Sequence, residues 1–253
     1  MTTLTETFIA VGGHPVRCLE GGLGPTLLFL HGMGGLRPGA PFLELLADRY
    51  RVVAPEHPGF GETEPLAWID TMVDLATHYR RMLRETLSEE AVFVVGHSLG
   101  GWLAAEVAFQ NPDLVRRQVL VAPAGLRGAG EGIDPFGLNE EQMLVTAVAD
   151  PATAPPSPKP SDAHVIRNRQ MAARLAWSPR LADPKLPTRL SLVRTPTLLI
   201  WGAQDRIIPA DRAAAFQEHL PDVRLVTVEG AGHLPMLEAP ERFVSAVNEF
   251  FDG

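Results

Sequence analysis

Short apolar runs bounded by glycine or proline recur along the chain, and they predict strands. The later runs are apolar at nearly every position, which is typical of parallel strands covered on both faces. The first two runs lie close together, so we expect them to form an antiparallel hairpin. The predicted strands span residues 7–11, 16–19, 26–30, 51–54, 91–95, 118–121, 197–201 and 224–228.

Segments with helical character separate these strands. They span residues 69–87, 99–110, 210–220 and 241–251. Alternation of strand and helix predicts parallel strands joined by right-handed crossovers, with helices on both faces. The predicted fold class is α/β, with a mostly parallel eight-stranded sheet flanked by helices.

The alternation stops between residues 124 and 190, where no convincing strand pattern is found. The stretch PATAPPSPKP at 151–160 has five prolines in ten residues, which excludes a helix interior. Short helices are expected near 139–148 and 162–176. We interpret 124–190 as a helical lid inserted between two core strands, with 1–123 and 191–253 forming the core.

Composition narrows the class of protein. The 253 residues are 45% hydrophobic and 21% charged, enough material for one large globular domain. A net charge of −8 argues against nucleic acid or anionic lipid as partners. The single cysteine, Cys18, excludes an internal disulfide, and the scattered histidines predict no metal site. No stretch predicts a signal peptide or membrane span, so we expect a cytoplasmic protein of unknown oligomeric state.

The stretch VVGHSLGGWLA at 94–104 carries the strongest chemical signal. A predicted strand ends near Gly96, and a predicted helix begins at Leu99. A serine on so sharp a corner presents its hydroxyl at the carboxyl end of the sheet, beside the free amides of the helix N-terminus. Gly96-His97-Ser98-Leu99-Gly100 therefore matches the nucleophile elbow G-x-S-x-G, with Ser98 as the nucleophile.

A serine needs a base to take its proton, and the base needs an acid to orient it. His233 follows the last predicted strand, and Asp205 follows the strand that ends at Trp201. Loops from the carboxyl ends of neighbouring parallel strands converge, so we predict a Ser98, Asp205 and His233 triad. Asp211 and Asp222 are alternative acids.

Two backbone amides are the predicted donors for the oxyanion that develops during attack on a carbonyl. One belongs to Leu99, directly after the nucleophile. The other belongs to Met33 in the glycine-rich stretch LHGMGG, which follows the strand at 26–30.

The sequence resembles the α/β-hydrolase superfamily through LHGMGG, APEHPGFGET, GHSLGG, PTLLIWGAQDRIIP and VEGAGHLPMLEAPERF. The resemblance covers nearly the whole chain and implies a Ser-Asp-His triad, a variable lid at 124–190 and no cofactor. It implies hydrolysis of carboxylic esters with small to medium, largely apolar groups through an acyl-enzyme.

Other activities of this superfamily remain open. One is carbon–carbon bond hydrolysis in ring-cleavage pathways, although such enzymes typically have a tryptophan where this chain has Leu234. Lactonase, perhydrolase and non-catalytic receptor functions are further alternatives. Met143, Met171 and Trp177 are the expected apolar contributors to the substrate pocket. Arg167, Arg169 and Arg174 are weaker candidates, for a substrate carboxylate.

Overall fold

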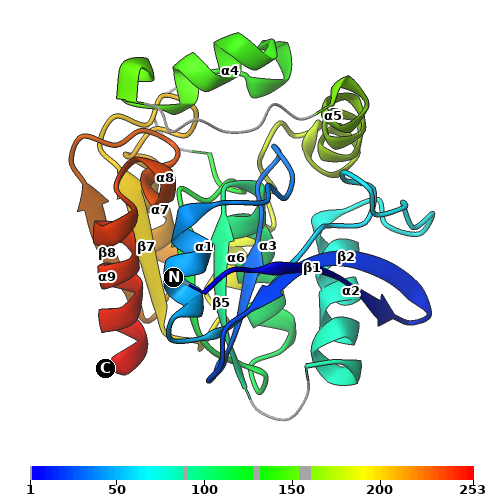
Figure 1. Cartoon of the computed structure of the whole chain (residues 1–253). Coiled ribbons are helices and arrows are strands. Elements are labelled where there is room, and N and C mark those ends of the chain that lie inside the picture. The colour runs from blue at the N-terminus through cyan, green and yellow to red at the C-terminus, as the bar shows by residue number, and fades with distance from the viewer. Residues whose placement is uncertain (1, 88–90, 128–131, 154–160) are drawn as a thin grey trace.

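The protein was analysed as a computed structural model, which describes residues 2–87, 91–127, 132–153 and 161–253. All eight predicted strands are confirmed, with ends that move by a few residues (Figure 1). The strands are β1 (Thr5–Val11), β2 (His14–Gly21), β3 (Thr26–Leu30), β4 (Arg51–Pro55), β5 (Val92–His97), β6 (Val115–Val121), β7 (Thr197–Gly202) and β8 (Val223–Val228).

The strands form one sheet in the order β1-β2-β4-β3-β5-β6-β7-β8. The β1–β2 and β2–β4 pairs are antiparallel, and every later pair is parallel. The sheet is therefore mostly parallel and is led by a hairpin, as predicted. Because β3 lies directly beside β5, the loops that follow these two strands meet at the carboxyl edge.

The four predicted core helices are also confirmed, as α2 (Met72–Glu85), α3 (Leu99–Gln110), α7 (Arg212–His219) and α9 (Pro240–Asp252). Helix α2 starts three residues later than predicted because Thr71 and Asp74 cap it reciprocally, each side chain accepting a backbone N–H from the other residue. Three short helices were not predicted: α1 (Pro41–Ala47), α6 (Leu186–Leu190) and α8 (Pro235–Glu238).

Alternate side chains of the central strands enter two separate cores. Leu28 and Leu30 of β3 pack into the core that includes residues of α2 and α3. Leu27 and Phe29 of the same strand enter the core that includes residues of α1 and α9. This period of two explains why the central strands are apolar throughout, since both faces of the sheet are covered.

Between β6 and β7 the chain forms α4 (Glu140–Ala147), α5 (Asp162–Ala176) and α6, with the 3-10 turns Pro135–Gly137 and Pro151–Thr153. The two helices predicted in this inserted segment are therefore confirmed. Figure 1 shows α4 and α5 above the carboxyl edge of the sheet. Most of the proline-rich turn, residues 154–160, lies outside the described residues. In the described part of the chain, no helix is long and apolar enough to cross a membrane.

Candidate active site

Ser98 occupies the sharp corner between β5 and α3. Its backbone has φ 54° and ψ −115°, a conformation that costs energy for a residue with a side chain. A Cβ on Gly96 would collide with the backbone of Gly100, and a Cβ on Gly100 would collide with the carbonyl oxygens of Leu30 and His31. Both glycines are therefore required by close backbone contact around the corner, and Ser98 itself stays partly exposed.

His233 and Asp205 form a buried pair at the same edge of the sheet. The Nδ1 of His233 lies 2.7 Å from Oδ2 of Asp205, and both residues are 6% exposed. The other oxygen, Oδ1, accepts hydrogen bonds from the backbone N–H groups of Ile207 and Ile208, both at 2.9 Å. The carboxylate is thus fixed by three contacts, in an arrangement that can orient an imidazole. The alternative acids lie elsewhere in the chain, with Asp211 at the start of α7 and Asp222 directly before β8.

His97 links the serine corner to the histidine loop. Its Nε2 lies 2.9 Å from the backbone carbonyl oxygen of His233, and the two rings are 4.8 Å apart. Burial first, and then the nearby His233, hold the pKa of His97 well below its usual range. A neutral imidazole with its proton on Nε2 can donate to that carbonyl, so His97 braces the loop of His233 beside Ser98.

No hydrogen bond joins the side chains of Ser98 and His233, both of which belong to the described residues. Contacts between a nucleophile and its base are often long in an unliganded site and shorten in the substrate complex. The catalytic roles of Ser98, Asp205 and His233 remain predictions, and the geometry that bears on them is the strained corner, the Asp205–His233 pair and the His97 brace.

The two predicted oxyanion donors, the N–H groups of Leu99 and Met33, belong to two segments that meet at the serine corner. Leu99 is the first residue of α3, so its N–H is one of the helix's free N-terminal donors. Gly32 is so close to the corner that a Cβ on it would lie 3.2 Å from Cβ of Ser98. Met33 follows directly, in a turn closed by the bond from Gly35 N–H to Gly32 O at 3.1 Å. The loop after β3 therefore reaches the corner that carries Ser98.

A buried histidine pair, His31 and His57, supports this loop, and the part played by His57 was not predicted from the sequence. His31 accepts the backbone N–H of His57 on Nε2 at 2.9 Å, while the two rings stack 3.7 Å apart. Nδ1 of His57 lies 2.6 Å from the hydroxyl of Tyr79 on α2. Burial lowers the pKa of His31 to about 4 and, as the largest cause, also holds the pKa of His57 well below its usual range, so both rings favour the neutral form. The motif APEHPGFG, which contains His57, was the available signal.

The inserted segment bonds directly to the histidine loop. The N–H of His233 donates to the carbonyl of Ala147, at the end of α4, at 2.6 Å. Glu238 accepts the N–H of Gly232 at 2.8 Å with one oxygen and the N–H of Ala149 at 2.7 Å with the other. The sequence analysis missed Glu238, although its position in GAGHLPMLE, five residues after the histidine, was visible.

Arg206 adds a further contact to the end of α4. Its Nη2 donates to the carbonyl oxygens of Val145 and Val148, at 2.6 and 2.7 Å. Because Arg206 follows the predicted acid Asp205, the acid loop and the histidine loop both hold the same end of α4. This residue was also missed by the sequence analysis.

The candidate pocket residues have different environments. Met171 is buried and Met143 is half-buried, and both pack with the apolar core on the α2–α3 side of the sheet. Trp177 is 58% exposed at the end of α5 and packs edge-on against Phe136, with ring centroids 5.3 Å apart. Their role in substrate binding remains a prediction. The three candidate arginines form ion pairs within the chain, Arg167 with Glu64, Arg169 with Glu140 and Arg174 with Asp70.

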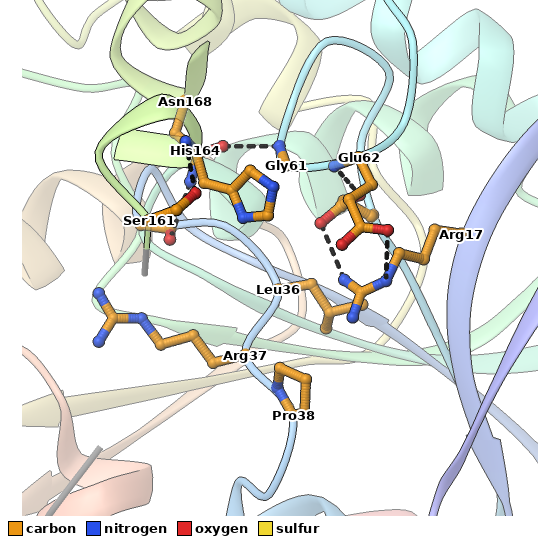
Figure 2. A pocket seen from close by; sticks show the side chains of 11 residues that line it. Arg17, Leu36, Arg37, Pro38, Gly61, Glu62, Ser161, His164 and Asn168 are labelled. Atoms are coloured by element: carbon orange, nitrogen blue, oxygen red, sulfur yellow. Dashed lines mark hydrogen bonds and ion pairs between the residues drawn. The ribbon is translucent and has the colours of Figure 1, made fainter. Parts of the chain in front are cut away.

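A cavity of about 260 Å³ lies beside the oxyanion loop but does not include the triad. Gly34 and Leu36 of that loop, Gly61 of the loop after β4, and Asn168 of α5 contribute to its wall (Figure 2). The buried Arg17–Glu56 ion pair, at 3.1 Å, forms another side. Among the described residues, no group of three or more His, Cys, Asp or Glu side chains has the arrangement of a metal site.

Comparison with known proteins places this geometry in a family. The model described as "Alpha/beta hydrolase family" matches residues 27–246. The chain is 30% identical to the 2-hydroxy-6-oxononadienedioate/2-hydroxy-6-oxononatrienedioate hydrolase 2 of Pseudomonas putida, over 89% of this chain and 87% of that protein. It is 25% identical to Lipase 1 of Psychrobacter immobilis, over 85% of this chain and 73% of that protein.

A solved structure of a membrane phospholipase A, described as a bacterial virulence factor, superposes with a TM-score of 0.86 and 26% identity. The match covers 99% of this chain and 86% of the phospholipase chain. The family match spans most of the sequence, including the strand–serine–helix corner and the loops that carry Asp205 and His233. The chain therefore belongs to the alpha/beta hydrolase family.

Proposed function

We propose that this protein is a serine hydrolase that cleaves carboxylic esters with small to medium, largely apolar groups through an acyl-enzyme. The observation that carries the proposal is the buried Asp205–His233 pair, joined at 2.7 Å and braced by His97 next to a strained serine corner. Burying a carboxylate and an imidazole and holding Ser98 at a positive φ both reduce the stability of the fold. A catalytic role for these three residues explains why the fold retains them.

In the first half of the reaction, Oγ of Ser98 attacks the ester carbonyl carbon, and His233 takes the hydroxyl proton on Nε2. The amides of Leu99 and Met33 donate to the negative carbonyl oxygen. Collapse of the tetrahedral intermediate breaks the bond to the alcohol oxygen, which leaves with the proton from His233. Asp205 stays ionised and stabilises the imidazolium while it exists.

In the second half, His233 removes a proton from water, and the resulting hydroxide attacks the acyl-enzyme. The second tetrahedral intermediate expels Oγ of Ser98, which regains its proton from His233. The products are a carboxylic acid and an alcohol, and the enzyme returns to its starting state. Each step uses only this chain's own residues and water.

We propose that the inserted segment acts as a lid over the site and limits the size of the substrates that can bind. Met143, which is half-buried, and Met171, which is buried, are apolar side chains on that segment, and they suit a modest apolar pocket rather than an open groove. We therefore expect butyrate and hexanoate esters to be better substrates than long-chain triglycerides.

Carbon–carbon bond hydrolysis is the second candidate. It is favoured by the 30% identity to the Pseudomonas putida 2-hydroxy-6-oxononadienedioate hydrolase. It is disfavoured by Leu234, which stands where such enzymes typically have a tryptophan, and by the ion pairs that already engage Arg167, Arg169 and Arg174. A substrate with two carboxylates would need cations that these pairs do not leave free.

The test is a series of p-nitrophenyl esters from acetate to dodecanoate, run beside a 2-hydroxy-6-oxo-dienoate. The proposal predicts steady turnover with a maximum at short or medium chains. Rapid dienoate cleavage with negligible ester turnover would transfer the assignment to the second candidate. A single burst of p-nitrophenol equal to the enzyme concentration, with no steady state, would instead indicate a receptor on the same fold.

A further inference from the structure

Asn168 of α5 joins the inserted segment to two loops of the core. Asn168 is buried, with only 6% of its surface exposed. Its Oδ1 accepts the N–H of Gly61 at 2.8 Å, and its Nδ2 donates to the carbonyl oxygen of Gly34 at 3.1 Å. Figure 2 shows Asn168 at the edge of the cavity, with a dashed line joining its side chain to Gly61.

These two bonds require an amide in one orientation. The N–H of Gly61 needs an acceptor, while the carbonyl of Gly34 needs a donor, and an asparagine side chain offers one of each. An aspartate has the same shape but could serve only Gly61. It would place an acceptor against the Gly34 carbonyl, and a buried pair of acceptors is unfavourable.

The carbonyl held by Asn168 belongs to the oxyanion loop. Gly34 directly follows Met33, whose N–H is a proposed donor, within the turn closed by Gly35 N–H and Gly32 O. Peptide units are planar, so fixing one carbonyl of a four-residue turn restricts the orientation of its neighbours. Gly32, at the start of the turn, lies against Ser98.

The backbone at Gly35 is fitted to this amide. Its φ is +82°, in the left-handed region, and a Cβ there would lie 2.5 Å from Nδ2 of Asn168. The loop therefore accommodates the Asn168 side chain only because residue 35 lacks a side chain.

We propose that Asn168 is a positioning residue, which holds the oxyanion loop so that the N–H of Met33 faces Ser98. This inference rests on the proposed function. In this proposal, packing of α5 against the core and formation of the oxyanion hole are coupled, because the Asn168 amide takes part in both. The nearby Arg174 also ties α5 to the core, through Asp70 and the carbonyl of Ala67, but these contacts do not involve the oxyanion loop.

The experiment compares Asn168→Asp and Asn168→Ala with wild type and with the control Arg174→Ala. One readout is hydrogen–deuterium exchange of a peptide covering residues 32–36, which requires no turnover. The second is kcat and KM for p-nitrophenyl butyrate. Circular dichroism confirms that each variant is folded, and Asn168→Ala replaces Asn168→Asp if the buried charge prevents folding.

Faster exchange at 32–36 and a kcat reduced about tenfold or more, with KM changed less than kcat, is the expected result for both Asn168 variants. Arg174→Ala should keep wild-type exchange there and wild-type kcat. The proposal is overturned if the Asn168 variants exchange at residues 32–36 no faster than Arg174→Ala does. It is also overturned if they exchange faster there but keep the wild-type kcat. If wild type hydrolyses no ester, the proposed function fails on that ground alone, and the exchange comparison still decides whether Asn168 holds the loop.

Discussion

The imidazole Nε2 of His97 donates a hydrogen bond to the backbone carbonyl of His233 at 2.9 Å. His97, the residue directly before the candidate nucleophile, thus holds the loop that carries the candidate base. His97 and His233 are 136 positions apart in the sequence. This bond links the end of β5 to the loop that follows β8.

Replacing His97 should therefore disturb catalysis without changing which group carries the proton. His97→Phe keeps a ring but removes the donor, and we expect kcat to fall about tenfold or more through misplacement of His233. His97→Gln retains an N–H donor and should lose less. Steady-state kinetics across pH 5–9 make the comparison, and equal losses in the two variants would mean that the hydrogen bond is not what matters.

Asp205→Asn tests the acid. The asparagine oxygen can still accept the N–H groups of Ile207 and Ile208, so the melting temperature should remain close to that of wild type. Its NH₂ would face Nδ1 of His233 and favour the wrong tautomer, so kcat should fall by about 10⁴. Asp211→Asn, at the alternative acid, is the matched control. If Asp211→Asn loses the activity and Asp205→Asn retains it, the acid has been misassigned.

Glu238→Gln tests the contact between the inserted segment and the histidine loop. The carboxylate accepts two N–H groups, from Gly232 and Ala149, whereas an amide could accept only one and would oppose the other with its NH₂. We expect kcat/KM to fall several-fold and proteolysis of the segment at 132–153 to become faster. Glu241→Gln, an exposed carboxylate on α9, should change neither. Unchanged kinetics and proteolysis in Glu238→Gln would count against this contact.

Stability should decrease as pH falls from about 6.5 to about 4. Burial is the largest cause that lowers the pKa of His78 from its usual 6.5 to about 4. Between these values the unfolded chain binds more protons than the folded one, so the free energy of unfolding rises with pH and is lost on acidification. His78→Leu removes this group and a buried Nε2 without a hydrogen-bond partner. Melting temperatures from pH 7.5 to 4 should fall less steeply in the variant than in wild type, and parallel curves would refute the assignment.

The strands and long helices could be predicted from the sequence because their signals are local. β3 and β5 are apolar runs stopped by glycine, and α3 ends at the Asn111–Pro112 pair that was visible in the sequence. The short helices α1, α6 and α8 were missed because four to seven residues contain too few turns for a helical period. Tertiary packing rather than local preference stabilises them.

The predicted triad residues and the predicted oxyanion donor Met33 share one property, which is a place in the segment that follows a parallel strand. Ser98, Asp205, His233 and Met33 follow β5, β7, β8 and β3, so topology alone brings their loops together. Asn168 and Glu238 lie on helices, and each accepts an N–H from a residue far away in the sequence, Gly61 at 107 positions and Ala149 at 89. No spacing in the sequence encodes these two distant contacts, and only the folded chain reveals them.

The central claim is that Ser98 is the nucleophile, and labelling with a fluorophosphonate tests it most directly. The reagent forms a phosphorus–oxygen bond to an activated serine and releases fluoride. Intact mass should increase by one adduct, peptide mapping should place the adduct on Ser98, and Ser98→Ala should not be labelled while remaining folded. Labelling should also be slower in Asp205→Asn. An adduct on another residue, or ester hydrolysis that persists in Ser98→Ala with wild type unlabelled, would contradict the account.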